Sequence, residues 1–122
     1  MEEALTYLRH AVELVPNDAE LLHDIVGYCM QLGHTKDAAH YQEMIALHYF
    51  DTHQVTELLA ALQQLITLDR NNYEAYDMLG QMYQSLGQYG QAIWVYKNLA
   101  QVNPGSSVAR ERLAMLQDVQ RG

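Results

Sequence analysis

The chain has 122 residues, enough for one small domain, and 49% of them are apolar against 18% charged, which excludes wholesale disorder. Acidic residues outnumber basic ones by 15 to 7, so nucleic acids and anionic membranes are poor partners. The single cysteine, Cys29, excludes an internal disulfide and a zinc site built on cysteines. The sequence has no apolar run long enough to span a membrane and no signal-peptide pattern, so we expect a cytoplasmic location.

Apolar residues recur at three- and four-residue spacing along almost the whole chain, which predicts an all-α fold. Asn, Asp, Gly and the two prolines, Pro16 and Pro104, interrupt the pattern and separate the helices. The predicted helices span 2–15, 19–32, 36–49, 53–69, 73–86, 89–102 and 107–120. Their links are short, so we expect about six to seven helices that run antiparallel to their neighbours, in a stack of hairpins or a bundle.

The segment 73–106 carries the clearest motif of the chain. Its small residues Gly80 and Ala92 stand where two helices of a hairpin would approach closely, and Gly87 fits the position after a helix C-terminus. The complete motif is Tyr76, Leu79, Gly80, Tyr83, Gly87, Ala92, Tyr96 and Pro104. This spacing resembles the tetratricopeptide repeat (TPR), a helical hairpin with a period of 34 residues. The resemblance implies an array of antiparallel hairpins, an α-solenoid, whose first helices line a concave face.

A weaker copy of the motif lies at 19–52. Gly33 and Ala38 match Gly87 and Ala92 of the motif. The departures are Val26 for the first glycine, Cys29 for the tyrosine and Gln42 for the aromatic residue. We expect Cys29 to be buried and unreactive, with no cation beside it.

The turns at 16–20 and 70–74 share one design, in which Asn17 and Asn71 are expected to cap the next helix, each with a glutamate three residues later. They are separated by one repeat plus about 20 residues. One explanation is a turn at Asp51-Thr52, which makes 39–72 a degenerate repeat. The other is one long helix over 36–69, whose outer half is covered by another subunit in a domain-swapped homodimer. That outer half carries Leu58, Leu59, Leu62, Leu65 and Ile66.

The predicted organisation is a single TPR-like domain over 1–122. Its parts are a half repeat at 1–18, a degenerate repeat at 19–52, an extra helix or the continuation of helix 36–49 at 53–72, a clear repeat at 73–106 and a capping helix at 107–122. Ser106 and Ser107 fit the cap of that last helix.

No residue pattern points to catalysis. The six histidines include no pair four residues apart, and phosphate loops, dinucleotide fingerprints and nucleophile elbows are missing from the sequence. We therefore expect neither enzyme activity nor a cofactor or metal site.

The concave face implied by the resemblance is neutral to acidic. Its positions are Glu20, His23, Gly27, Met30 and Gln31 in the first copy and Glu74, Asp77, Gln81, Gln84 and Ser85 in the second. It lacks the Lys, Asn and Arg residues with which some family members hold a C-terminal carboxylate, so we expect a basic or apolar segment as partner. Trp94 stands where the repeat usually has a charged residue, so it either forms a contact surface or packs against a neighbouring helix.

The predicted function is that of a non-catalytic adaptor or scaffold, which binds a peptide or helix of another protein on its concave face. Two alternatives are a self-assembly module built on the surplus helix and Trp94, and a small secretion-type chaperone.

Overall fold

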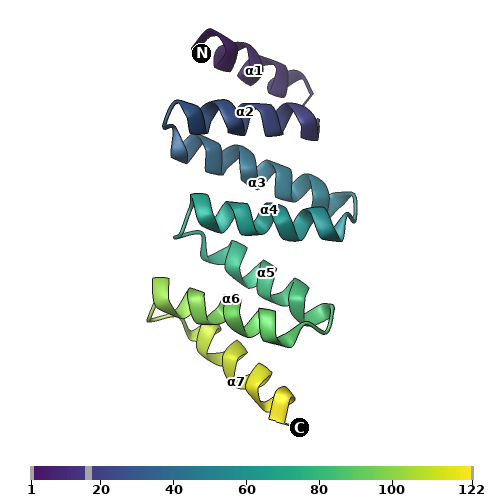
Figure 1. The fold of residues 1–122 in the computed structure, drawn as a ribbon, viewed down its shortest axis with the longest axis vertical. Coiled ribbons are helices and arrows are strands. Elements are labelled where there is room, and N and C mark those ends of the chain that lie inside the picture. Colours follow the sequence, from purple (N-terminus) through teal and green to yellow (C-terminus); the bar gives the residue numbers. More distant parts are fainter. Residues whose placement is uncertain (1, 16–17, 122) are drawn as a thin grey trace. The chain divides into compact units, whose positions relative to one another are not determined.

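The computed structural model describes residues 2–15 and 18–121, and these form seven α-helices without a strand (Figure 1). The helices are α1 (Glu2–Leu14), α2 (Ala19–Gln31), α3 (Thr35–Asp51), α4 (Val55–Leu68), α5 (Tyr73–Ser85), α6 (Tyr89–Val102) and α7 (Ser107–Arg121). The all-α prediction is confirmed, and each predicted helix end lies within about two residues of the observed one.

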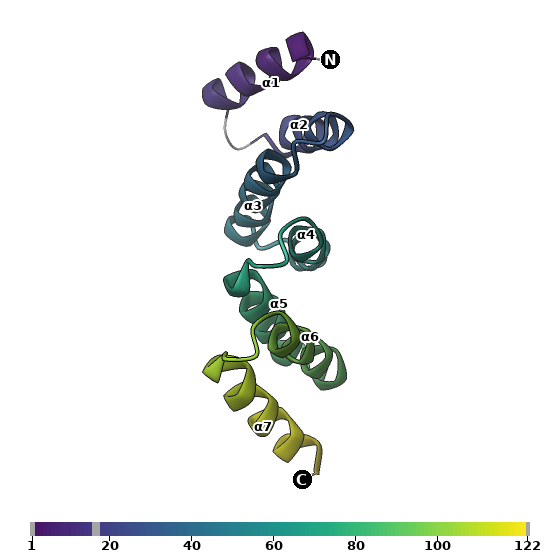
Figure 2. The same ribbon diagram turned by 90° about the vertical axis from the view of Figure 1, so that its left-hand side faces the viewer.

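The helices fall into two compact units, an N-terminal unit (Met1–Asp69) with α1 to α4 and a C-terminal unit (Arg70–Gly122) with α5 to α7. Within each unit, every helix packs against the next one in the chain. Figure 2 shows α1 and α3 on one side of the N-terminal unit and α2 and α4 on the other. In the C-terminal unit, α6 lies opposite α5 and α7. The single domain expected over 1–122 stays a prediction.

Among the residues that the structure describes, polar side chains cap the N-termini of α2, α5 and α7. Asp18, Asn72 and Ser106 each accept a hydrogen bond from the backbone N–H three residues further on, at 3.1, 3.2 and 3.2 Å. The Ser106 cap was expected, whereas Asn71 as the cap of α5 is wrong by one residue, because the helix begins only after Asn72. The predicted cap Asn17 lies outside the described residues, as does Pro16.

The chain turns between α3 and α4, so the long helix over 36–69 is wrong. The turn lies slightly later than expected: Thr52 follows the last residue of α3, His53 has φ 58°, and Gln54 precedes α4. The backbone N–H groups of His53 and Gln54 donate to the carbonyls of Phe50 and Tyr49, at 3.2 and 3.0 Å. These bonds close the last turn of α3 and satisfy carbonyls that the helix itself leaves unpaired.

The same turn ends α2 and α5. Gly33 and Gly87 both have φ 75°, and their N–H groups donate to the carbonyls three residues before them, at 3.1 and 3.0 Å. His53 stands 34 residues before Gly87, as the repeat frame 39–72 requires. Helix α3 is thus joined by equivalent turns to α2 and to α4, which supports that frame.

Helix α4 buries its apolar side in its own chain. Leu58, Leu62 and Leu65 are only 3, 2 and 2% exposed, and α4 packs against α3. Leu59 and Ile66 are half-buried. The cover from another subunit that the long helix would have required is therefore unnecessary, and domain swapping loses its structural basis.

Helix α1 is tied to α3 by an ion pair beside the buried cysteine. Arg9 Nη2 donates to the Asp37 carboxylate at 2.8 Å. Burial raises the pKa of the Cys29 thiol, and the nearby Arg9 guanidinium offsets this only in part. The expectation that no cation lies beside Cys29 is wrong, but the thiol is fully buried, as expected.

The substitution His53→Gly is expected to stabilise the N-terminal unit by about 0.5–1 kcal/mol. A residue with a Cβ is strained at positive φ, whereas glycine adopts it readily. Urea unfolding followed by circular dichroism measures the change. Thr52→Gly is the control: φ there is −93° and the hydroxyl donates to the His48 carbonyl at 2.9 Å, so this variant loses stability. A loss of stability in both variants would contradict the strain at His53.

Candidate functional site

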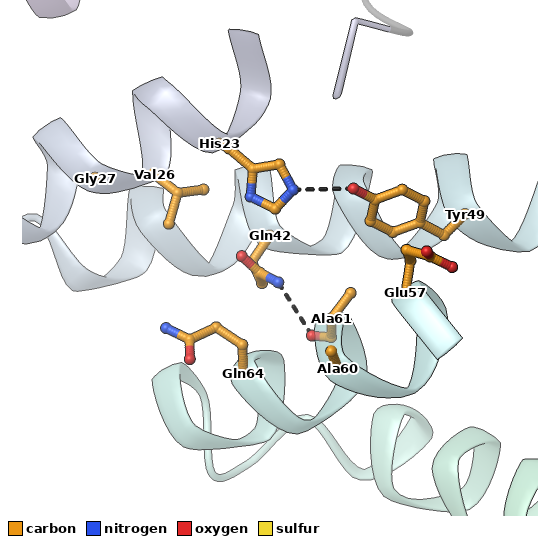
Figure 3. Close-up of a pocket in the computed structure, with 9 residues that line it drawn as sticks. All are labelled: His23, Val26, Gly27, Gln42, Tyr49, Glu57, Ala60, Ala61 and Gln64. Carbon is orange, nitrogen blue, oxygen red and sulfur yellow. Dashed lines mark hydrogen bonds between the residues drawn. The ribbon is translucent and has the colours of Figure 1, made fainter. Parts of the chain in front are cut away.

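The N-terminal unit carries an open groove of about 420 Å³ that α2, α3 and α4 line together (Figure 3). The lining residues are His23, Val26 and Gly27 from α2, Gln42 and Tyr49 from α3, and Glu57, Ala60, Ala61 and Gln64 from α4. Both α2 and α4 run antiparallel to α3, so they are parallel to each other. Their first turns and the end of α3 therefore lie at the same end of the groove.

Polar side chains surround small apolar ones in this groove. His23 Nε2 and the Tyr49 hydroxyl are hydrogen-bonded at 3.1 Å, which joins α2 to α3. Gln42 is 3% exposed, and its amide nitrogen donates to the Ala61 carbonyl at 3.1 Å. Figure 3 shows the amide oxygen of Gln42 on the side away from this bond. The groove thus offers both hydrogen-bonding groups and an apolar surface, as a peptide-binding surface requires.

The groove opens where the N-terminal unit departs from the repeat motif. In the C-terminal unit, the Tyr96 ring lies against Gly80, and its hydroxyl donates to the Asp77 carboxylate at 2.7 Å. The equivalent positions of the weaker copy hold Gln42, Val26 and His23. All three line the groove.

The structure brings part of the predicted concave face of α2 into this groove. His23 and Gly27 line it directly. Met30 adjoins it, since the Gln64 amide nitrogen lies 3.9 Å from the Met30 sulfur. Glu20 and Gln31 are exposed on α2 but are not among the lining residues.

The predicted residues of α5 line two other hollows, both in the C-terminal unit. Glu74 and Asp77 line one of about 360 Å³, together with the start of α7. Gln81, Gln84 and Ser85 line another of about 370 Å³, together with Arg112 of α7. Neither hollow includes a residue of the N-terminal unit.

Asp77 is held by contacts within its own unit. Its carboxylate accepts hydrogen bonds from Tyr96 at 2.7 Å and from the Gln81 amide at 3.0 Å, and it lies 3.7 Å from the Arg112 guanidinium. Burial and the bond to Asp77 raise the pKa of the Tyr96 hydroxyl. These contacts join α5, α6 and α7, so Asp77 has a structural role in this unit.

Trp94 is 56% exposed on α6, so the structure favours a surface position over packing against another helix. Sequence reasoning missed exposed apolar residues on α7, among them Val108 and Met115. Val108 and Met115 are 40 and 52% exposed, and they stand one 34-residue period after the predicted positions Glu74 and Gln81. Counting forward one 34-residue period from Glu74 and Gln81 identifies both positions. The segment 107–122 was predicted only as a capping helix, so this count was not applied to it.

Two observations bear on other kinds of site. Within residues 2–15 and 18–121, no three His, Cys, Asp or Glu side chains gather as metal ligands would. Over the same residues, the structure has no helix with the length and apolar character needed to cross a membrane.

Residues 61–93 match the tetratricopeptide repeat family model. The matched segment overlaps the motif predicted at 73–106 and includes the second half of α4, all of α5 and the start of α6. The fold is tetratricopeptide-like. The predicted resemblance is thereby confirmed, and among curated proteins none is similar enough to count as a relative.

Solved TPR structures share this fold over most of the chain. MamA from Desulfovibrio magneticus RS-1 is 19% identical, with a TM-score of 0.56 over 98% of this chain and 76% of that one. YrrB, a TPR protein with an unusual peptide-binding site, is 19% identical, with a TM-score of 0.54 over 98% and 69%. The first TPR of Spaghetti (RPAP3), bound to the HSP90 peptide SRMEEVD, is 15% identical, with a TM-score of 0.54 over 85% and 94%.

Proposed function

We propose that this TPR-like chain is a non-catalytic protein-interaction module, and that its N-terminal unit binds a peptide segment of another protein in the groove between α2 and α4. The observation that carries the proposal is the groove itself, which is lined by Gln42 and Val26, two departures from the repeat motif. Peptide binding by YrrB and by the first TPR of Spaghetti supports the same class of function.

The chemistry of the lining residues suits an extended segment. Gln64 presents an amide, which pairs with a peptide backbone as both donor and acceptor. Gly27 and Ala60 leave room for a main chain to approach the helices. The segment is held by its backbone along the groove, and its side chains provide the specificity.

Closing the groove tests the proposal. Short random peptides displayed on phage are selected on the wild-type protein, and the enriched peptides are titrated by fluorescence anisotropy against Ala60→Trp. Ala60 is exposed and lines the groove, so a tryptophan there fills the groove without entering the core. We expect affinity to fall at least about tenfold, a loss of roughly 1.4 kcal/mol.

Ala114→Trp is the matched control, because Ala114 is exposed on α7 and lines no part of this groove. It should leave affinity unchanged. Equal binding to both tryptophan variants, or no enriched peptide, would contradict the proposal. Light scattering over a concentration series covers the self-assembly alternative: a dimer that Ala60→Trp abolishes would assign the groove to a second copy of the chain.

A further inference from the structure

Charge is distributed very unevenly between the two units. Residues 1–69 hold 11 of the 15 acidic side chains but only two of the seven basic ones, Arg9 and Lys36, so this segment has a formal charge of −9. Residues 70–122 hold four acidic and five basic side chains, a formal charge of +1. Nearly all the negative field of the protein therefore comes from the unit that carries the groove, and such a field attracts cationic segments.

Part of this negative charge lies at one end of the groove. Glu57 lines the groove in the first turn of α4, and Glu20 lies in the first turn of the parallel helix α2. Tyr49, near the end of α3, also lines the groove, and Figure 3 shows Glu57 and Tyr49 at the same end of it. We call this part of the groove, made by His23, Tyr49 and Glu57, the acidic end.

Neither basic residue of this unit neutralises the acidic end. Arg9 forms its ion pair with Asp37, at 2.8 Å. Lys36 lies in the first turn of α3, whereas Tyr49 lies in its last turns, so the two are at opposite ends of the helix. Among the residues whose contacts the structure describes, no lysine or arginine pairs with Glu57.

A carboxylate in a first helical turn also has a structural explanation, because it interacts favourably with the helix dipole. That explanation accounts for Glu57 and Glu20 separately. It does not account for a carboxylate that lines a groove beside an aromatic ring, in a unit with a large excess of negative charge.

We propose that the acidic end is a recognition site for a lysine or arginine side chain of the bound segment. The cation pairs with the Glu57 carboxylate and lies near the Tyr49 ring, whose face attracts cations. The alkyl stem of the partner side chain lies along Ala60, and its backbone continues toward Gly27 and Gln64. This inference rests on the proposed function and specifies its partner as a basic peptide segment.

The test uses peptides enriched on the wild-type protein from the random library described above. We expect them to share a lysine or arginine, and replacing it with norleucine, which keeps the stem but not the charge, to weaken binding about tenfold. Glu57→Gln should weaken binding of the basic peptide about fivefold and remove most of the effect of norleucine, since the cation then has no carboxylate to pair with.

Glu43→Gln is the control for net charge, because Glu43 is exposed on α3 and does not line the groove. It should change affinity less than about twofold. Circular dichroism shows whether Glu57→Gln folds, and the norleucine peptide tests the cation on the unaltered protein in any case.

The outcomes separate the two proposals. Some peptides could lose binding to Ala60→Trp and yet bind the wild type without a lysine or arginine. That result would overturn the basic-segment inference and leave the groove as a peptide site. A norleucine effect of equal size on wild type and Glu57→Gln would overturn the role of Glu57. If no peptide depends on Ala60, the proposed function fails and this inference fails with it.

Discussion

Leu62→Ala is expected to lower the free energy of unfolding by about 3 kcal/mol, the largest effect we predict for a single truncation in this protein. Leu62 is 2% exposed on α4, which packs against α3. The substitution removes buried methyl groups and leaves a cavity that the surrounding helices fill only in part. Urea denaturation monitored by circular dichroism gives the free energy.

Leu47→Ala is the matched control, because Leu47 is 53% exposed on α3. Its effect should stay below about 0.5 kcal/mol. Unfolding should not depend on protein concentration in either variant, since α4 is covered by its own chain. A concentration-dependent midpoint that Leu62→Ala removes would show that α4 is buried against a second subunit instead.

Gly80→Ala is expected to destabilise the C-terminal unit by about 2 kcal/mol, although alanine favours helix more than glycine does. A Cβ at Gly80 overlaps the ring of Tyr96. That ring cannot easily move away, because Tyr96 is fully buried and its hydroxyl donates to Asp77. The variant must therefore separate α5 from α6 or break the hydrogen bond.

Gly27→Ala provides the same chemical change in the middle of another helix. A Cβ at Gly27 has no heavy atom within 4 Å, so alanine should stabilise the protein by about 1 kcal/mol through its helix propensity alone. The two substitutions are thus expected to have opposite signs. Stabilisation by both would show that the contact between Gly80 and Tyr96 does not restrict the position.

The sequence was most informative about the helices and about the hairpin at 73–106. Caps and positive-φ residues depend on local chemistry, so Ser106, Gly33 and Gly87 could be placed without any knowledge of tertiary contacts. The approach of α5 and α6 could also be predicted, because Gly80 and Tyr96 belong to a motif with a known spacing.

The groove lined by α2, α3 and α4 could be predicted only on one side. His23 and Gly27 lie on α2, whose register follows from the motif, and both line the groove. Ala60 and Glu57 lie on α4, whose register the sequence left open between a separate helix and the continuation of α3. The helix that lies beside α2 is determined by how α2 and α4 each pack on α3. These are tertiary contacts, which a local sequence pattern does not predict.

The equivalent turns at the two ends of α3 have a consequence for how such a chain changes during evolution. In a helical repeat array each repeat contacts only its neighbours, so a hairpin of two helices that belongs to one repeat alone can be added or removed as a unit. Helix α3 forms one hairpin with α2 and another with α4. Deleting either hairpin would therefore leave the remaining helix without its partner. Residues 19–68 are therefore expected to be inherited together as one three-helix block.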